Sequence, residues 1–297
     1  MKFTAVVCIL ILLKTSTAQV ATCQDDGGVN TDWFFIYKPP DSLSSKIMKS
    51  GPNPTWNPSA GAINEIADHA ISRTMADFIA ENINIKVLAY SDDPPNMPPQ
   101  NVNSKAKGVL LIDNRETDAA AWFVHTVPKF LAYRGPYSWP ASETAKGHMF
   151  LCVSFTEAHL NSYAKFTTKA NQVAANIQII GKHSKSYSDM YAKVLKNKLG
   201  ASIRIWASSD TKSKSICKGQ YQLRKVTSPL QLADSQVSRE ADSARWAVVD
   251  GKNIVCLTTN DYKATEKQIP GAAVCLENAA VYNIFRIAAS KVEACNK

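Results

Sequence analysis

The chain has 297 residues, of which 45% are hydrophobic and 20% charged, and its formal net charge is +9. This length and composition exclude a disordered or fibrous chain, and they fit one large or two small globular domains. The basic excess favours polyanionic partners such as nucleic acid, sulfated glycans or anionic lipid surfaces, although a protein that is merely basic and soluble carries the same charge.

Residues 1–18 have the layout of a secretory signal peptide. Lys2 precedes the apolar run AVVCILILL, and small residues follow it, so we expect cleavage after Ala18 or near Ala21. The run is too short for a membrane span. We therefore predict a secreted, extracellular protein with no membrane span and a single domain region over residues 19–297. Without the signal peptide, 32 basic and 25 acidic residues remain, a net charge of about +7.

The signal peptide also contains Cys8, so the mature chain keeps six cysteines. An even number in an exported chain predicts three disulfides, but spacing alone does not choose their connectivity. No zinc-type CxxC pair occurs. The sequence therefore predicts neither a metal site nor a cofactor.

A first round of elements lies before residue 160. The sequence predicts a strand in TDWFFIYKPP, ended by its two prolines, and a helix from Ala60 to Asn82 on the spacing of the apolar residues. A polar loop, SDDPPNMPPQNVNSKAK, follows. After it come a predicted hairpin of GVLLI with AAWFVHTV, a buried strand MFLCVSF, and helical spacing in TEAHLNSYAKF.

A second round resembles the first. It has a predicted helix near SYSDMYAKVLKNKLG ended by Gly200, a strand ASIRIWAS, and a lysine-rich segment. RWAVVDGKNIVCLT predicts a hairpin because Asp250-Gly251 suits a type I′ turn, and AAVYNIFRIAAS predicts an amphipathic helix. We expect an α/β (α+β) fold of two related halves, roughly residues 22–160 and 161–297.

Several of these segments together resemble the deoxyribonuclease II family. They are DWFFIYKPP, KGVLLIDN, WFVHTVPKF, YSWP followed by LCVSF, the SDMY helix, DSARWAV and the last three cysteines. The resemblance runs in order from Cys23 to Cys295. It implies a phospholipase D-like fold, in which two pseudo-symmetric α/β halves with central mixed sheets each give a His-x-Lys motif to one metal-independent site for DNA hydrolysis.

Both motifs are altered in this chain. The first falls on Lys105-Ala106-Lys107, so the resemblance places Lys105 at the histidine position and keeps the lysine as Lys107. The second falls on Ser243-Ala244-Arg245, with Ser243 for the histidine and Arg245 for the lysine. In the family one histidine attacks phosphorus and the other protonates the leaving oxygen. Neither lysine nor serine without a base replaces that pair, and losing one member of such a unit already costs most of the rate.

The resemblance also implies a disulfide pairing: Cys23 with Cys152, Cys217 with Cys295, and Cys256 with Cys275. Every partner is present in the sequence. The scaffold is thus retained while the catalytic residues are replaced, as expected of a secreted, nematode-type pseudoenzyme. Such a member would act towards host extracellular molecules.

The remaining histidines carry no motif of this kind. His183-Ser184-Lys185 has the letters of the motif, but it precedes the SDMY helix, where the family has no catalytic histidine, so a polar helix entry is the simpler interpretation. We expect His125 to be a satisfied core residue or one behind the site. The tryptophans Trp33, Trp122, Trp139, Trp206 and Trp246 are expected to build the core.

We therefore predict an inactive deoxyribonuclease II-like protein whose Lys105, Lys107 and Arg245 bind a polyanion, either DNA or a sulfated glycan. The alternative is an active, metal-independent acid endodeoxyribonuclease with a rearranged site. A further surface, with Lys212, Lys214, Lys218, Arg224 and Lys225, is either a second binding region or a solvated loop anchored by Cys217. No oligomeric state is predicted.

Overall fold

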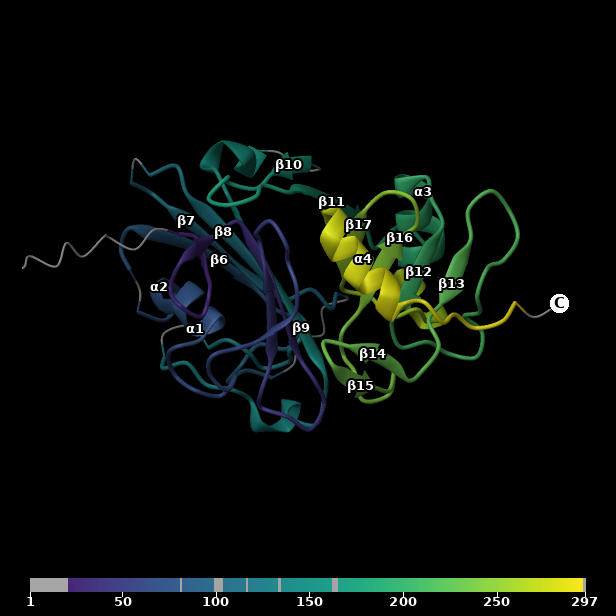
Figure 1. Cartoon of the computed structure of the whole chain (residues 1–297), viewed down its shortest axis with the longest axis horizontal. Helices are drawn as coiled ribbons and strands as arrows, with labels where there is room; N and C mark the ends of the chain where they lie inside the picture. Colours follow the sequence, from purple (N-terminus) through teal and green to yellow (C-terminus); the bar gives the residue numbers. More distant parts are fainter. Residues whose placement is uncertain are drawn as a thin grey trace, which may run out of the picture.

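The computed structural model describes residues 21–80, 82–98, 104–115, 117–132, 135–161 and 165–295. The proposed signal peptide and part of the Pro-rich loop lie outside the described residues. Two seven-stranded sheets dominate the fold, and they lie side by side in Figure 1, the first in purple to teal and the second in teal to yellow.

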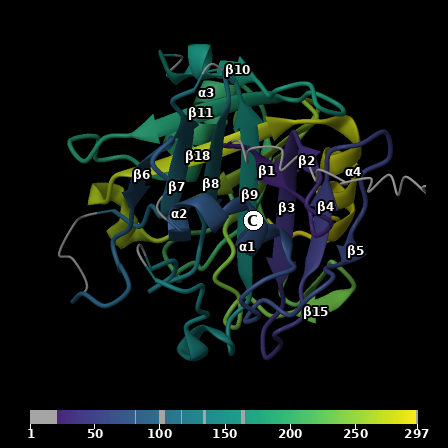
Figure 2. The ribbon, with the colours of Figure 1, turned by 90° about the vertical axis from the view of Figure 1, so that its left-hand side faces the viewer.

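The first sheet is antiparallel throughout, with the order β5-β4-β3-β9-β8-β7-β6. Its central strands carry the apolar runs that the sequence showed, and every residue of β3 and β9 is buried. Figure 2 shows α1 (Ala70–Thr74) and α2 (Ala76–Ala80) in front of this sheet. The strands are β3 (Trp33–Lys38), β4 (Lys46–Lys49), β5 (Asn57–Pro58), β6 (Ile85–Tyr90), β7 (Gly108–Asp113), β8 (Ala120–His125) and β9 (His148–Phe155).

The second sheet has the order β10-β11-β18-β17-β16-β12-β13, and only its β12–β13 pair is parallel. A π-helical turn, η3 (Met190–Leu195), continues into α3 (Lys196–Leu199) and packs on the outer face. The strands are β10 (Lys165–Thr167), β11 (Asn176–Lys182), β12 (Ile203–Trp206), β13 (Leu223–Lys225), β16 (Trp246–Val249), β17 (Ile254–Thr258) and β18 (Gly271–Glu277).

Smaller elements complete the chain. Two short ribbons are β1 (Cys23–Gln24) with β2 (Asn30–Thr31), and β14 (Leu230–Leu232) with β15 (Ser235–Val237). Three 3-10 turns are η1 (Ala141–Glu143), η2 (Glu157–Asn161) and η4 (Ala264–Gln268). Within the described ranges, no helix is both long and apolar enough to cross a membrane.

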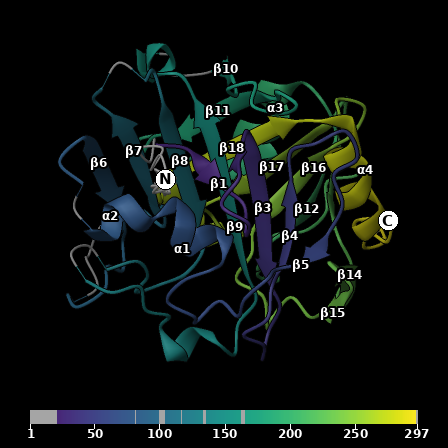
Figure 3. The ribbon, with the colours of Figure 1, turned by 60° about the vertical axis from the view of Figure 1, so that its left-hand side comes forward.

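The main core lies between the two sheets, whose strands Figure 3 shows from a third direction. Trp33 of the first sheet and Trp206 and Trp246 of the second are fully buried in it, as the sequence predicted, whereas Trp122 is partly buried at its margin and Trp139 packs in the first half's outer core. The helix α4 (Ala279–Ala288) inserts Phe285 here, with its ring 5.2 Å from that of Trp246 and 5.6 Å from that of Phe35. Burial of this apolar surface fixes the two sheets face to face.

The three disulfides are those that the family resemblance implied. Cys23–Cys152 joins β1 to β9 in the first half, while Cys217–Cys295 and Cys256–Cys275 lie in the second. The first sheet uses strands before Phe155 and the second uses strands after Lys165. We propose on this basis that the halves divide near residue 160.

The helix predicted from Ala60 to Asn82 was wrong over its first part. Residues 60–69 form turns, and Asp68 has a φ of 67°, which an α-helix does not contain. Asp26 holds this segment by accepting hydrogen bonds from the backbone N–H groups of Ala60 and Ala70. The side chain of His69 then caps α1.

Two other local predictions also need correction. The hairpin of β16 and β17 is confirmed, but Val249 pairs with Ile254, so the connection has four residues in place of the two of a type I′ turn. TEAHLNSYAKF, predicted helical, contains only the 3-10 turn η2 before β10 begins at Lys165. Residues 162–164 of that segment are outside the described ranges.

Candidate functional site

Each altered motif lies directly before an inner strand of its own sheet. Lys105 and Lys107 precede β7, and Ser243 and Arg245 precede β16. The start of β7 needs a glycine, because a Cβ at Gly108 would lie 2.5 Å from the Tyr90 hydroxyl and 2.7 Å from a backbone oxygen. The face-to-face packing of the sheets therefore brings the two motifs together.

Three of the four motif residues line one cavity of about 200 Å³: Lys105, Lys107 and Arg245. The fourth, Ser243, does not line it, but its backbone oxygen accepts a hydrogen bond from Arg245 Nη1 at 3.3 Å. Among the described residues, no hydrogen bond joins the Ser243 hydroxyl to a basic group. Within the described ranges, that hydroxyl therefore has no base that would activate it as a nucleophile.

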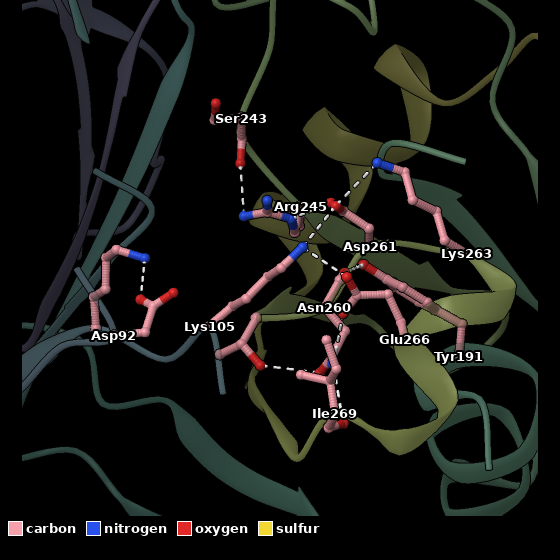
Figure 4. Close-up of polar contacts among 12 residues, drawn as sticks. Asp92, Lys105, Tyr191, Ser243, Arg245, Asn260, Asp261, Lys263, Glu266 and Ile269 are labelled. Atoms are coloured by element: carbon pink, nitrogen blue, oxygen red, sulfur yellow. Dashed lines mark hydrogen bonds and ion pairs between the residues drawn. The ribbon is translucent and has the colours of Figure 1, made fainter. Parts of the chain in front are cut away.

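Lys105 is held by two carboxylates of the second half (Figure 4). Its Nζ lies 3.0 Å from Asp261 Oδ2 and 2.6 Å from Glu266 Oε1, and both carboxylate side chains are almost completely buried. Burial alone would lower the pKa of Lys105, but the hydrogen bond to Glu266 and the negative charges of both partners raise it above its ordinary value. Lys105 is therefore a fixed ammonium, able to stabilise negative charge but unable to attack phosphorus or accept a proton.

The other two cations are paired in the same manner. Arg245 Nε lies 2.5 Å from Asp261 Oδ1, and Lys107 forms an ion pair with Asp92. Although burial opposes it, the pKa of Asp261 is lowered far below its usual range by Arg245 and then by Lys105. With Lys263, 3.3 Å from Asp261, the site has four cations against three carboxylates. It keeps one positive charge in excess.

Sequence reasoning missed all three carboxylates, Asp92, Asp261 and Glu266. Glu266 is 161 positions from Lys105, in a connection that carries no recognisable motif. The sequence near Glu266 does contain one local signal, the glycine Gly271. A Cβ at Gly271 would lie 1.6 Å from Asn260 Oδ1, so only glycine leaves space for the Asn260 amide. That amide donates through Nδ2 to Glu266 Oε2 at 3.2 Å. Asp92, Asp261 and Glu266 form ion pairs with ammonium and guanidinium groups. No cluster of metal-binding side chains occurs among the described residues.

All five histidines are described, and His125 is the one that lines the cavity. It is buried among Phe123, Phe130 and Phe150, and burial, followed by the charge of Lys107, lowers its pKa to about 3. His125 Nδ1 accepts a hydrogen bond from the Val127 N–H, so the neutral ring carries its proton on Nε2. His183 lies in an exposed turn and does not line the cavity.

The lysine-rich segment divides into two parts. Lys212, Lys214 and Lys218 are exposed, whereas Arg224 donates to the Glu293 backbone oxygen and Lys225 forms an ion pair with the Glu293 carboxylate at 3.1 Å. Three of the five cations therefore face solvent.

Asp242, the residue before Ser243, is a buried carboxyl at the junction of the two halves. It accepts hydrogen bonds from Trp206 Nε1 at 2.7 Å and from the Ala244 N–H at 3.0 Å. Gly147 of the first half packs against it, since a Cβ there would lie 2.4 Å from Asp242 Oδ1. Burial raises the pKa of Asp242 to about 6, despite these hydrogen bonds.

This shift makes stability depend on pH in a predictable direction. An unfolded Asp242 titrates near 3.8, so between about pH 4 and pH 6 the folded chain binds the extra proton, and stability rises as the pH falls. We expect the wild type to gain up to about 3 kcal/mol over an Asp242→Asn variant on going from pH 7 to pH 4. Denaturant unfolding at both pH values measures the difference. Asp234→Asn, at an exposed carboxyl, is the control; an equal pH dependence for wild type and Asp242→Asn would contradict the assignment.

Comparison with known proteins agrees with this architecture. The family model described as deoxyribonuclease II matches residues 22–178 and 157–295. Plancitoxin-1 of Acanthaster planci is 24% identical, with 97% of this chain and 96% of the relative aligned, and cell-death-related nuclease 7 of Caenorhabditis elegans is 22% identical, with 96% and 90% aligned. Deoxyribonuclease-2-beta of Mus musculus is 31% identical over 45% of this chain and 40% of the relative.

Proposed function

Because this chain belongs to the deoxyribonuclease II family, we propose that it is a member that has lost DNA cleavage and binds polyanions. The observation that carries the proposal is the state of Lys105. This residue stands where the family resemblance places a histidine, and Asp261 and Glu266 keep its amine protonated. A nuclease of this chemistry needs a nucleophile and a proton donor, and neither altered motif supplies a histidine for these roles.

Charge supports the binding half of the proposal. Lys105, Lys107 and Arg245 line one cavity, Lys263 gives their ion-pair network one positive charge in excess, and Lys212, Lys214 and Lys218 add exposed cations. The ion-paired cations of the cavity suit a single anionic group in a fixed position, because their network has one positive charge in excess. The exposed lysines suit the repeated phosphates or sulfates of a longer polymer. DNA and sulfated glycans both meet this description.

Export is part of the same proposal. The N-terminal layout of residues 1–18 supports a signal peptide, and the three disulfides fit an oxidising compartment. We place the mature chain outside the cell, where host extracellular polyanions are its candidate partners.

The second candidate function is an active acid endodeoxyribonuclease with a rearranged site. His125 favours it, because this imidazole lines the same cavity as Lys107 and Arg245. Its low pKa leaves it unprotonated at mildly acidic pH, so it would act as the nucleophile, but its burial and the proton on Nε2 oppose that role.

Plasmid cleavage decides between the two functions. We expect the purified mature protein to leave supercoiled plasmid intact at about pH 5 with a chelator present, because Lys105 cannot replace a histidine. Gel electrophoresis of samples taken over hours measures the fraction of supercoiled plasmid that is cleaved. Cleavage that Lys107→Ala or His125→Gln abolishes, and that Lys252→Ala, at an exposed lysine outside both proposed binding regions, leaves unchanged, would show an active enzyme and end the pseudoenzyme proposal.

Salt dependence tests polyanion binding. Affinity for a labelled DNA duplex, followed by fluorescence anisotropy, should fall as salt rises from 50 to about 200 mM, because cations that contact phosphates release counterions. A triple Lys212→Ala, Lys214→Ala, Lys218→Ala variant should reduce the slope of log affinity against log salt by up to about 2.7, roughly 0.9 per contact.

A matched triple variant at the exposed lysines Lys86, Lys165 and Lys252 removes the same charge from other parts of the fold. It separates a localised contact from the effect of net charge. Binding that does not respond to salt would refute an electrostatic interaction.

A further inference from the structure

Beside the cavity of the motif cations lies a second hollow that is apolar. This second hollow, of about 320 Å³, shares Tyr90, Trp122 and Ile179 with the cationic cavity. Its other walls are Leu88, Leu110, Phe155, His159, Leu160 and Phe166. The two hollows are therefore adjacent, one lined by cations and the other apolar, and together their volumes fall within the size range of ligand sites, about 300–1,000 Å³.

The second hollow is apolar because a row of side chains that is buried in the core at β9 continues to the exposed edge strand β6. Leu88 of β6 pairs with Leu110 of β7, Leu110 with Trp122 of β8, and Trp122 with Val153 of β9. Burial falls along this row, from Val153 at 1% exposed, through the half-buried Trp122 and Leu110, to Leu88 at 59% exposed. An exposed extension of a core of this kind marks a binding site for an apolar group.

The polar side chains that the two hollows share are hydrogen-bonded to each other. The Tyr90 ring lies over Gly108, where the missing side chain leaves space for it. Trp122 Nε1 donates to the Tyr90 hydroxyl at 2.9 Å, so neither polar atom needs a partner from a ligand. The walls offer hydrocarbon and ring faces and few groups that would recognise the edges of a nucleobase.

We propose that the two adjacent hollows together bind a single-chain amphiphilic anion, with its anionic head beside Lys105, Lys107 and Arg245 and its alkyl chain along Trp122, Leu110 and Leu88. The excess positive charge of the site matches the head, and the row of apolar side chains matches the chain. The proposal rests on the proposed function in one respect only, that the cavity holds an anion without cleaving it. The head is a carboxylate or a phosphate ester, and the experiment distinguishes them.

Calorimetric titration of the full mature chain with dodecanoate and with dodecyl phosphate, below their micelle concentrations, tests the proposal. We expect saturable binding at one site for at least one of them, and at least about tenfold weaker binding for dodecanol and for butyrate, which lack the charge or the chain. The tighter of the two anions identifies the head group. Equal binding of dodecanol and the anions, or no saturable binding of either anion, would overturn the proposal.

Two matched variants locate the site. Leu88→Glu should weaken binding of the tighter anion at least about tenfold, whereas Ile287→Glu, at an equally large apolar side chain that is 67% exposed on α4, should leave it unchanged. Both positions face solvent, so neither change disturbs the core. Equal losses in the two variants would refute the site. Because DNA binding is measured separately, failure of this test leaves the proposed polyanion binding to stand or fall by its own assay.

Discussion

Two buried carboxylates, Asp261 and Glu266, determine what the site of this protein can do. A buried carboxylate without a partner costs several kcal/mol, so the surrounding fold must supply cations. Asp261 receives one from each half of the chain, Lys105 from the segment before β7 and Arg245 from the segment before β16. The same ion pairs that join the halves at this point hold Lys105 in its protonated state. The contact between the halves at this point and the charge state of Lys105 thus have one electrostatic cause.

The strongest apolar patterns predicted their elements correctly. Residues of β3, β9, the β7–β8 hairpin and α4 all form the structures that their spacing indicated. The strands β11 and β18 were missed: NIQIIGK shows only a short apolar run, and GAAVCLE begins with small residues that have low strand propensity. Their pairing with each other and with β17 makes them strands, and such pairing is a property of the tertiary fold.

The site was predicted only in part, because it too depends on contacts that form only in the tertiary fold. Resemblance placed Lys105, Lys107 and Arg245 at one site, and the structure brings them to one cavity. It gave no sign of the contacts of Lys105 with Asp261 and Glu266, because an ion pair between residues more than 150 positions apart leaves no pattern in a single sequence. Asp92 was missed although it is only 15 positions from Lys107, because it lies in the segment predicted as a polar loop. Because of those carboxylates, the cations of the site are ion-paired, and not free to bind phosphate as the sequence had suggested. The site as a whole keeps a small excess of positive charge.

The central claim is that Lys105 is a permanent ammonium, and its own titration tests that most directly. In the protein labelled with ¹³C at lysine Cε, the Lys105 signal, assigned through a Lys105→Arg variant, should titrate above 10.5 because Glu266 and Asp261 stabilise the charged form. A pKa near or below neutrality would contradict the account, since Lys105 would then be an available base or nucleophile at the position where the family resemblance places a histidine.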